Sequence, residues 1–131
     1  GIKAVFDEVK RVAEAVGVKM LDYPEEAFWS RITIMGYYFK ATFDKEGKIA
    51  DISGPSSMKA RYITEDTPYG LVPVGLLARQ LGVSTPVINA VVELASVINQ
   101  TNYWEQGRKP EELGIAGLGR EELKRILEEG F

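Results

Sequence analysis

Histidine and cysteine are both absent from this chain of 131 residues. Without an imidazole, the chain has no histidine general base, no Ser–His pair and no histidine-ligated metal. Without a thiol, it has no disulfide framework and no thiolate nucleophile, which fits a reducing cytoplasm. Any enzymatic reaction must therefore take some of its groups from outside this chain.

Long apolar runs and an excess of basic residues are also missing. No stretch approaches the ~20 apolar residues that span a bilayer, and no signal-peptide pattern opens the chain. A net charge of −3 argues against a nucleic-acid-binding face. With 45% hydrophobic residues, the length fits one globular domain with a core. We expect no membrane and no nucleic acid among its partners.

Apolar residues recur at helical spacing over residues 2–16, which predicts an amphipathic helix. On its polar face, Lys3 and Asp7 are spaced for an ion pair, as are Asp7 and Arg11. Gly17 then provides a natural stop.

The next stretch is harder to interpret. Pro24 and the acids after it indicate a helix start, with a helix reaching at least Trp29. Residues 31–43 mix β-branched and aromatic residues without clean alternation, and 44–47 form a turn signal. We expect a helix followed by an irregular excursion, with a hairpin at 37–52 as the alternative.

Helical patterns dominate the rest of the chain. One segment follows Pro68 and reaches about Leu81, and a very apolar helix is predicted over 86–101, with Thr85 as its N-cap. The second helix is interpreted as core, with a dimer seam as the lesser alternative. A last helix is predicted from Gly119. The polar residues of the 86–101 helix form one narrow stripe: Asn89, Glu93, Ser96 and Gln100.

The glycines at 114–119 read G-x-x-G-x-G, which is not the dinucleotide-binding order, and no predicted strand precedes them. We therefore predict no cofactor site there, and no zinc, EF-hand or other metal motif occurs elsewhere. The sequence as a whole predicts a single, mainly helical, all-α domain over residues 1–131.

The densest polar segment lies at 61–73, where two prolines and a glycine punctuate a run of charged and aromatic residues. Two interpretations stay open. In the first, Thr64 or Thr67 caps a helix while Glu65 and Asp66 complement its positive end. In the second, the run lines a functional site, and residues 53–57 form either one wall of it or a plain connector.

A set of ordered motifs resembles the C-terminal helical domain of the octopine/nopaline (opine) dehydrogenase family. The motifs are Gly54-Pro55, Arg61-Tyr62-Ile63-Thr64-Glu65-Asp66-Thr67-Pro68-Tyr69-Gly70-Leu71-Val72-Pro73, Leu81-Gly82-Val83-Ser84-Thr85-Pro86, Glu105-Gln106-Gly107-Arg108 and Leu113-Gly114. They cover roughly residues 53–127, and their order is more specific than any one of them. The helix at 2–16 resembles the helix that opens that domain, whereas 31–52 departs from the pattern.

The resemblance implies an all-helical domain similar to the phosphogluconate dehydrogenase C-terminal type. In that family it follows an N-terminal Rossmann domain that binds NAD or NADP. The family condenses an α-keto acid with an amino acid or another amine and reduces the imine by hydride transfer. The family's catalytic histidine lies upstream, near the domain junction, which would explain a histidine-free chain.

Carried onto this sequence, the resemblance assigns Asp66 as the catalytic carboxylate that pairs with that histidine. It assigns Arg61 to a substrate carboxylate, with Tyr62, Glu65 and Tyr69 as further substrate-binding candidates. We expect the isolated chain to bind no cofactor alone and to be inactive without the Rossmann domain, on the same or a separate chain.

Two rival functions remain at the level of sequence. The chain could be a stand-alone helical dimerisation or interaction module that has kept the fold without the chemistry. It could also keep the fold but serve another substrate, as in related hydroxyacid or ketopantoate reductases, although the Arg61–Asp66 run argues against this. A homodimer is compatible with any of the three.

Overall fold

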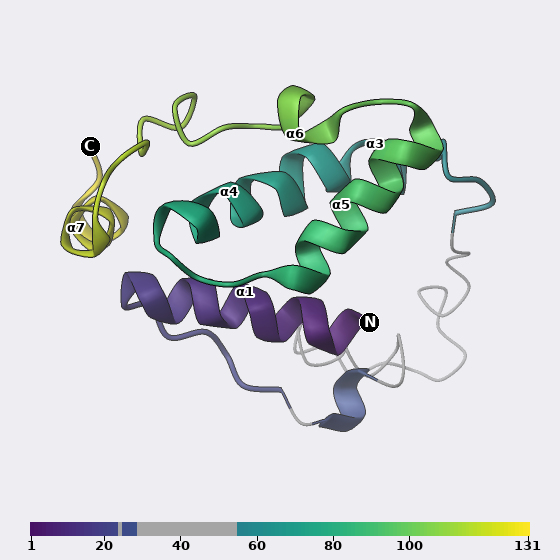
Figure 1. Ribbon diagram of the computed structural model, residues 1–131. Helices are drawn as coiled ribbons and strands as arrows, with labels where there is room; N and C mark the ends of the chain where they lie inside the picture. Colours follow the sequence, from purple (N-terminus) through teal and green to yellow (C-terminus); the bar gives the residue numbers. More distant parts are fainter. Residues whose placement is uncertain (24, 29–54) are drawn as a thin grey trace. The chain divides into compact units, whose positions relative to one another are not determined.

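The computed structural model describes residues 1–23, 25–28 and 55–131 (Figure 1). By its internal contacts the chain divides into two compact units. One comprises Gly1, Lys3–Met20 and Pro55–Phe131, and the other comprises Ile2 and Leu21–Gly54. The described residues form helices and turns and contain no strand, so the all-α prediction is confirmed. The hairpin alternative at 37–52 lies outside these residues.

The elements follow the chain in the order shown in Figure 1. They are α1 (Ile2–Val16), the 3₁₀ turn η1 (Glu25–Phe28), α3 (Arg61–Thr64), the π-helical turn η3 (Thr67–Leu71), α4 (Val72–Gln80), α5 (Pro86–Asn99), α6 (Tyr103–Gln106) and α7 (Arg120–Glu129).

The second unit is described only around η1. The ring of Tyr23 meets that of Phe28 edge to face, with centroids 6.4 Å apart. Where the structure describes it, the predicted helix start is the 3₁₀ turn Glu25–Phe28. Pro24 and Trp29, which the sequence placed in the same helix, lie outside the described residues.

Helix α1 follows its predicted bounds and ends at Gly17, whose φ of 86° is left-handed. The N–H of Gly17 closes the helix on the carbonyls of Ala13 and Glu14. The Lys3–Asp7 pair is confirmed at 2.7 Å. The predicted Asp7–Arg11 pair is wrong, because the Arg11 guanidinium lies 3.6 Å from Glu8 instead.

Glu8 of α1 is a buried carboxylate. Its two carboxylate oxygens accept the backbone N–H groups of Val87 and Ile88 at 2.9 and 2.8 Å. These donors belong to the first turn of α5 and have no partner within that helix. The predicted N-cap Thr85 makes no capping hydrogen bond with its side chain, because Glu8 of α1 takes that role.

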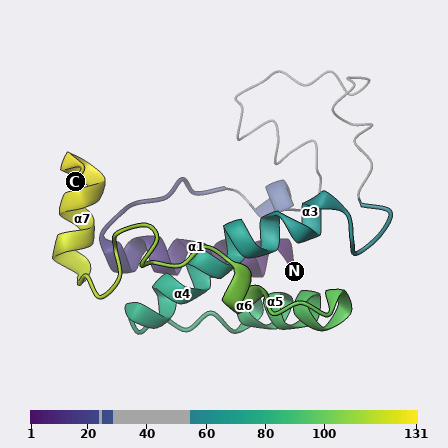
Figure 2. The same cartoon turned by 90° about the horizontal axis from the view of Figure 1, so that it is seen from above.

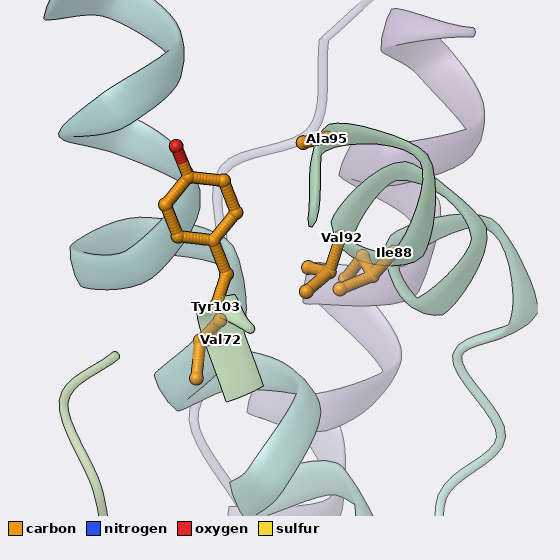
Figure 3. Close-up of a cluster of buried hydrophobic side chains, with 5 residues drawn as sticks. All are labelled: Val72, Ile88, Val92, Ala95 and Tyr103. Carbon is orange, nitrogen blue, oxygen red and sulfur yellow. The ribbon is translucent and has the colours of Figure 1, made fainter. Parts of the chain in front are cut away.

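The core of the first unit lies where α4, α5 and α6 meet. Figure 3 shows Ile88 and Val92 directed from α5 toward Val72 of α4 and Tyr103 of α6. From α1, Val5 and Val9 pack against this cluster, and Figures 1 and 2 both place α1 alongside α4. Periodic apolar residues thus form the predicted core from segments far apart in the chain.

Helix α5 has two different apolar faces. One carries the buried residues Ile88, Val92 and Ala95, which confirms its interpretation as a core helix. The other face leaves large apolar side chains exposed, and α5 ends at Asn99, two residues earlier than predicted. The exposed apolar residues are Val91, Leu94, Val97 and Ile98.

Helix α7 begins as predicted, with a Glu122 carboxylate oxygen accepting the N–H of Gly119 at 3.0 Å. The loop before it is secured by Gln80 at the end of α4. The Gln80 side-chain amide donates to the carbonyls of Ile115 (2.8 Å) and Leu118 (2.9 Å). Of the helices that the structure describes, none has both the length and the apolar character to span a bilayer.

Candidate functional site

The polar run at 61–71 forms two consecutive helical turns. Backbone bonds link the N–H of Glu65 to the carbonyl of Arg61 (2.9 Å) and the N–H of Tyr69 to the carbonyl of Glu65 (3.1 Å). Side chains four residues apart lie above one another on a helix. Arg61, Glu65 and Tyr69 therefore share one edge, and all three are exposed.

The second turn, η3, is a π-helix rather than the α-helical start that Pro68 predicted. Proline at position 73 explains the difference. Pro73 cannot donate to the carbonyl of Tyr69, and in a regular α-helix its ring would clash with that carbonyl. A wider turn relieves this clash, and such single π turns are frequent at functional sites.

Arg61 and Glu65 form the ion pair of this edge, with a nitrogen–oxygen distance of 3.1 Å. The side chains are 73% and 50% exposed, so the pair contributes little to folding. The hydrogen bond and charge of Glu65 raise the pKa of the Arg61 guanidinium, with smaller contributions from Tyr62 and Asp66. Arg61 is therefore a permanent cation beside two carboxylates.

The capping interpretation of this run is wrong for its threonines. Thr67 is buried, and neither α3 nor η3 receives a side-chain capping bond at its N-cap. The hydroxyl of Thr64 donates to the carbonyl of Ala60 at 3.4 Å. Asp66 occupies the N-cap position of η3, is exposed and makes no capping bond. Folding thus leaves the Asp66 carboxylate available.

The remaining sequence-predicted candidates are the tyrosines. Tyr62 is 47% exposed and Tyr69 is 58% exposed, which is high for large aromatic side chains. The Arg61 guanidinium carbon lies 5.4 Å from the centre of the Tyr62 ring. All five candidate residues are therefore on the surface of one short segment.

Arg108 belongs to the same surface but was not among the candidates from sequence. Its N–H donates to the carbonyl of Pro68 at 3.0 Å, and its guanidinium carbon lies 5.8 Å from the centre of the Tyr69 ring. Arg108 is the last residue of the family motif Glu105–Arg108, and this motif was the sequence signal that could have identified it. Sequence alone did not show that this motif crosses η3.

Gly107 explains how the crossing is achieved. A Cβ atom built there would lie 2.6 Å from Cγ1 of Val72 and 2.7 Å from the carbonyl oxygen of Pro68. Only glycine allows the backbone to pass that closely. The motif glycine thus seats Arg108 against the turn that follows Asp66.

A cavity of about 520 Å³ opens at this crossing. It lies within the size range of small-molecule sites. Its lining residues are Tyr69, Gln106, Arg108, Glu112 and Leu113.

We predict that Gly107→Ala destabilises the chain by about 2–4 kcal/mol, because the added methyl must displace backbone and a buried valine. Gly70→Ala is the matched control. It lies in η3 with open space around its Cβ position, so alanine should be neutral or slightly stabilising. Urea unfolding followed by circular dichroism measures both, and equal unfolding midpoints would contradict the close approach.

The loop that the sequence placed beside this segment is described only from Pro55 onward. Pro55, Ser56 and Ser57 are exposed, and the hydroxyl of Ser57 accepts the N–H of Lys59 at 2.9 Å. These contacts are those of a connector. Residues 53 and 54 of this loop lie outside the described residues.

Comparison with known proteins gives three findings. A model of the family described as NAD/NADP octopine/nopaline dehydrogenase, alpha-helical domain, matches residues 2–99. An opine dehydrogenase of Arthrobacter sp. (strain 1C) is 39% identical over 77 residues, which is 59% of this chain and 21% of that protein. Protein ocs of Agrobacterium vitis is 33% identical over 78 residues, covering 60% of this chain and 22% of that protein. The matches span about a fifth of the length of either relative.

Proposed function

Because this chain belongs to the octopine/nopaline dehydrogenase family, through its alpha-helical domain, we propose that it forms the substrate-binding side of an opine dehydrogenase cleft. The observation that supports this is the exposed edge at 61–69. Arg61, Asp66 and Tyr69 are presented to solvent and are not used to cap or stabilise the helices that carry them.

The proposed reaction joins an α-keto acid to an amino acid or another amine, with loss of water, and reduces the resulting imine. NAD or NADP, when bound, supplies the hydride. In the part of the chain that the structure describes, Gly114 and Gly117 lie in turns with positive φ and follow no strand, so this glycine run does not have the form of a dinucleotide-binding turn. We assign the cofactor to an N-terminal Rossmann domain, on the same or a separate polypeptide.

Within that cleft, Arg61 orients the substrate by holding a carboxylate in its planar donor fork. Asp66 accepts a hydrogen bond from a histidine of the cofactor-binding part, fixes its tautomer and stabilises its protonated form. That histidine then exchanges the proton needed at the substrate. Glu65 keeps Arg61 in place through their 3.1 Å contact. Tyr62 supplies a flat surface beside Arg61, and Tyr69 supplies one beside Arg108.

A chimera tests this proposal. In it, the present chain replaces the homologous helical domain of the Arthrobacter opine dehydrogenase. We expect the chimera to oxidise NADH or NADPH when given pyruvate and an amino acid, and the 131-residue chain alone to show no such activity. A folded chimera without turnover, or turnover by the chain alone, would overturn the proposal.

One observation favours the alternative of an interaction module. Val91, Leu94 and Val97 of α5 are exposed, and Leu94 and Val97 exceed half of their full exposure. Such a face suits a partner surface. If the chimera were inactive while the chain formed a dimer that Leu94→Glu dissociates, the module would become the better description.

A further inference from the structure

Arg108 stands out among the cations near the candidate site because its charge is not paired. In the part of the chain that the structure describes, ion pairs join Lys3 to Asp7, Arg11 to Glu8, Arg61 to Glu65 and Lys124 to Glu128. The Arg108 side chain meets only the ring of Tyr69. Its full donor fork is therefore available to an anion.

The carboxylate that lines the same cavity as Arg108 forms no ion pair with it. Glu112 lines the same cavity, but one of its oxygens accepts the N–H of Lys109 at 2.9 Å, which closes a local turn. Gln106, which also lines the cavity, contributes a neutral amide. The cavity thus has one unpaired cation, one amide donor and one aromatic ring, beside the Glu112 carboxylate and Leu113.

The backbone around Arg108 is tightly held. Its N–H is bonded to the carbonyl of Pro68, and Gly107 before it has no room for a side chain. The backbone that carries this cation is therefore held against η3, the turn that follows Asp66 and contains Tyr69. A preorganised cation loses less entropy when it binds a ligand.

Arg61 and Arg108 lie toward opposite ends of the polar edge. Arg61 and Tyr69 are eight positions apart along this helical segment, or about 12 Å along the axis at the α-helical rise, and Arg108 lies over Tyr69. Two arginine side chains can reach into this span from either end. A ligand with two carboxylates on one short backbone would meet one guanidinium at each.

We propose that Arg108, assisted by Gln106 and Tyr69, binds a second substrate carboxylate, distinct from the one held by Arg61. This inference rests on the proposed function. Joining an α-keto acid to an amino acid and reducing the resulting imine gives a secondary amine that carries a carboxylate on each side. A separate cation can hold each carboxylate, and Arg61 is already partly satisfied by Glu65. Arg108 then favours amino acids, which supply this second carboxylate, over simple amines, which lack it.

The test uses the 131-residue chain and two probes that differ by one carboxylate. N-(1-carboxyethyl)-L-alanine carries two, and N-ethyl-L-alanine carries one. Titrations followed by NMR of the arginine side-chain N–H signals give the dissociation constants. We expect the dicarboxylate to bind about tenfold more tightly, since a charge-assisted hydrogen-bond pair is gained.

Arg108→Gln should abolish that tenfold preference, while Arg125→Gln, an exposed cation of α7, should leave it unchanged. Circular dichroism verifies that both variants fold. Equal affinity of the unmodified chain for the two probes, or a preference that survives Arg108→Gln, overturns the inference. An active chimera with either result would leave the proposed function standing, whereas an inactive chimera would refute that function separately.

Discussion

Replacing Glu8 by alanine should lower the free energy of unfolding by about 3–5 kcal/mol, the largest stability effect expected for a single side chain here. The side chain is buried, and its two oxygens satisfy the N–H groups of Val87 and Ile88. Alanine would leave both donors unpaired at the positive end of α5, leave a cavity and remove the partner of Arg11. Urea unfolding of the chain measures the loss.

Two variants show whether the carboxylate is responsible. Glu14→Ala removes an exposed carboxylate from the same helix and should change the unfolding free energy by less than about 0.5 kcal/mol. Glu8→Gln keeps the size of the side chain but presents an NH₂ group where an acceptor is needed, so it should recover only part of the loss. A Glu8→Ala protein as stable as Glu14→Ala would show that the capping contact contributes nothing.

Asp66→Asn should lower the turnover of the chimera by about 10²–10⁴-fold, because asparagine cannot hold the histidine in the required tautomer or stabilise its positive charge. Since Asp66 is exposed and makes no capping bond, folding should be unaffected. Initial rates with saturating keto acid and amine measure turnover, and the urea midpoint measures stability.

Asp7→Asn gives the matched control, because it makes the same chemical change on an exposed position of α1. It should leave turnover unchanged. If Asp66→Asn also leaves turnover unchanged, Asp66 has no place in the mechanism. If turnover falls together with the unfolding midpoint, its role is structural.

Local features of the fold could be predicted where the residues of one segment determine its secondary structure. The bounds of α1 followed from apolar spacing and from Gly17, the only residue type that adopts a φ of 86° without strain. The start of α5 followed from Pro86. The end of α5 was missed, because Gln100 closes the helix in a left-handed conformation that its residue type does not favour.

The candidate site was predicted only in part, because only some of its residues lie together in one stretch of sequence. Arg61, Glu65 and Asp66 lie in one motif, and the ordered motifs indicated the family that the comparison then showed. Their roles remain proposals. Arg108 was missed as a site residue, since its approach to Tyr69 depends on a backbone bond to Pro68 across forty residues of chain.

The sequence by itself determined the helical class, the absence of imidazole and thiol chemistry, and the segment in which charged and aromatic residues gather. These follow from composition and from spacings of a few residues. Only the tertiary structure decided that Glu8 caps α5, that Gly107 brings Arg108 to η3, and that one apolar face of α5 stays exposed. Each of these features depends on which segments, far apart in the chain, come into contact when the chain folds. The spacing of residues along the chain does not encode those contacts.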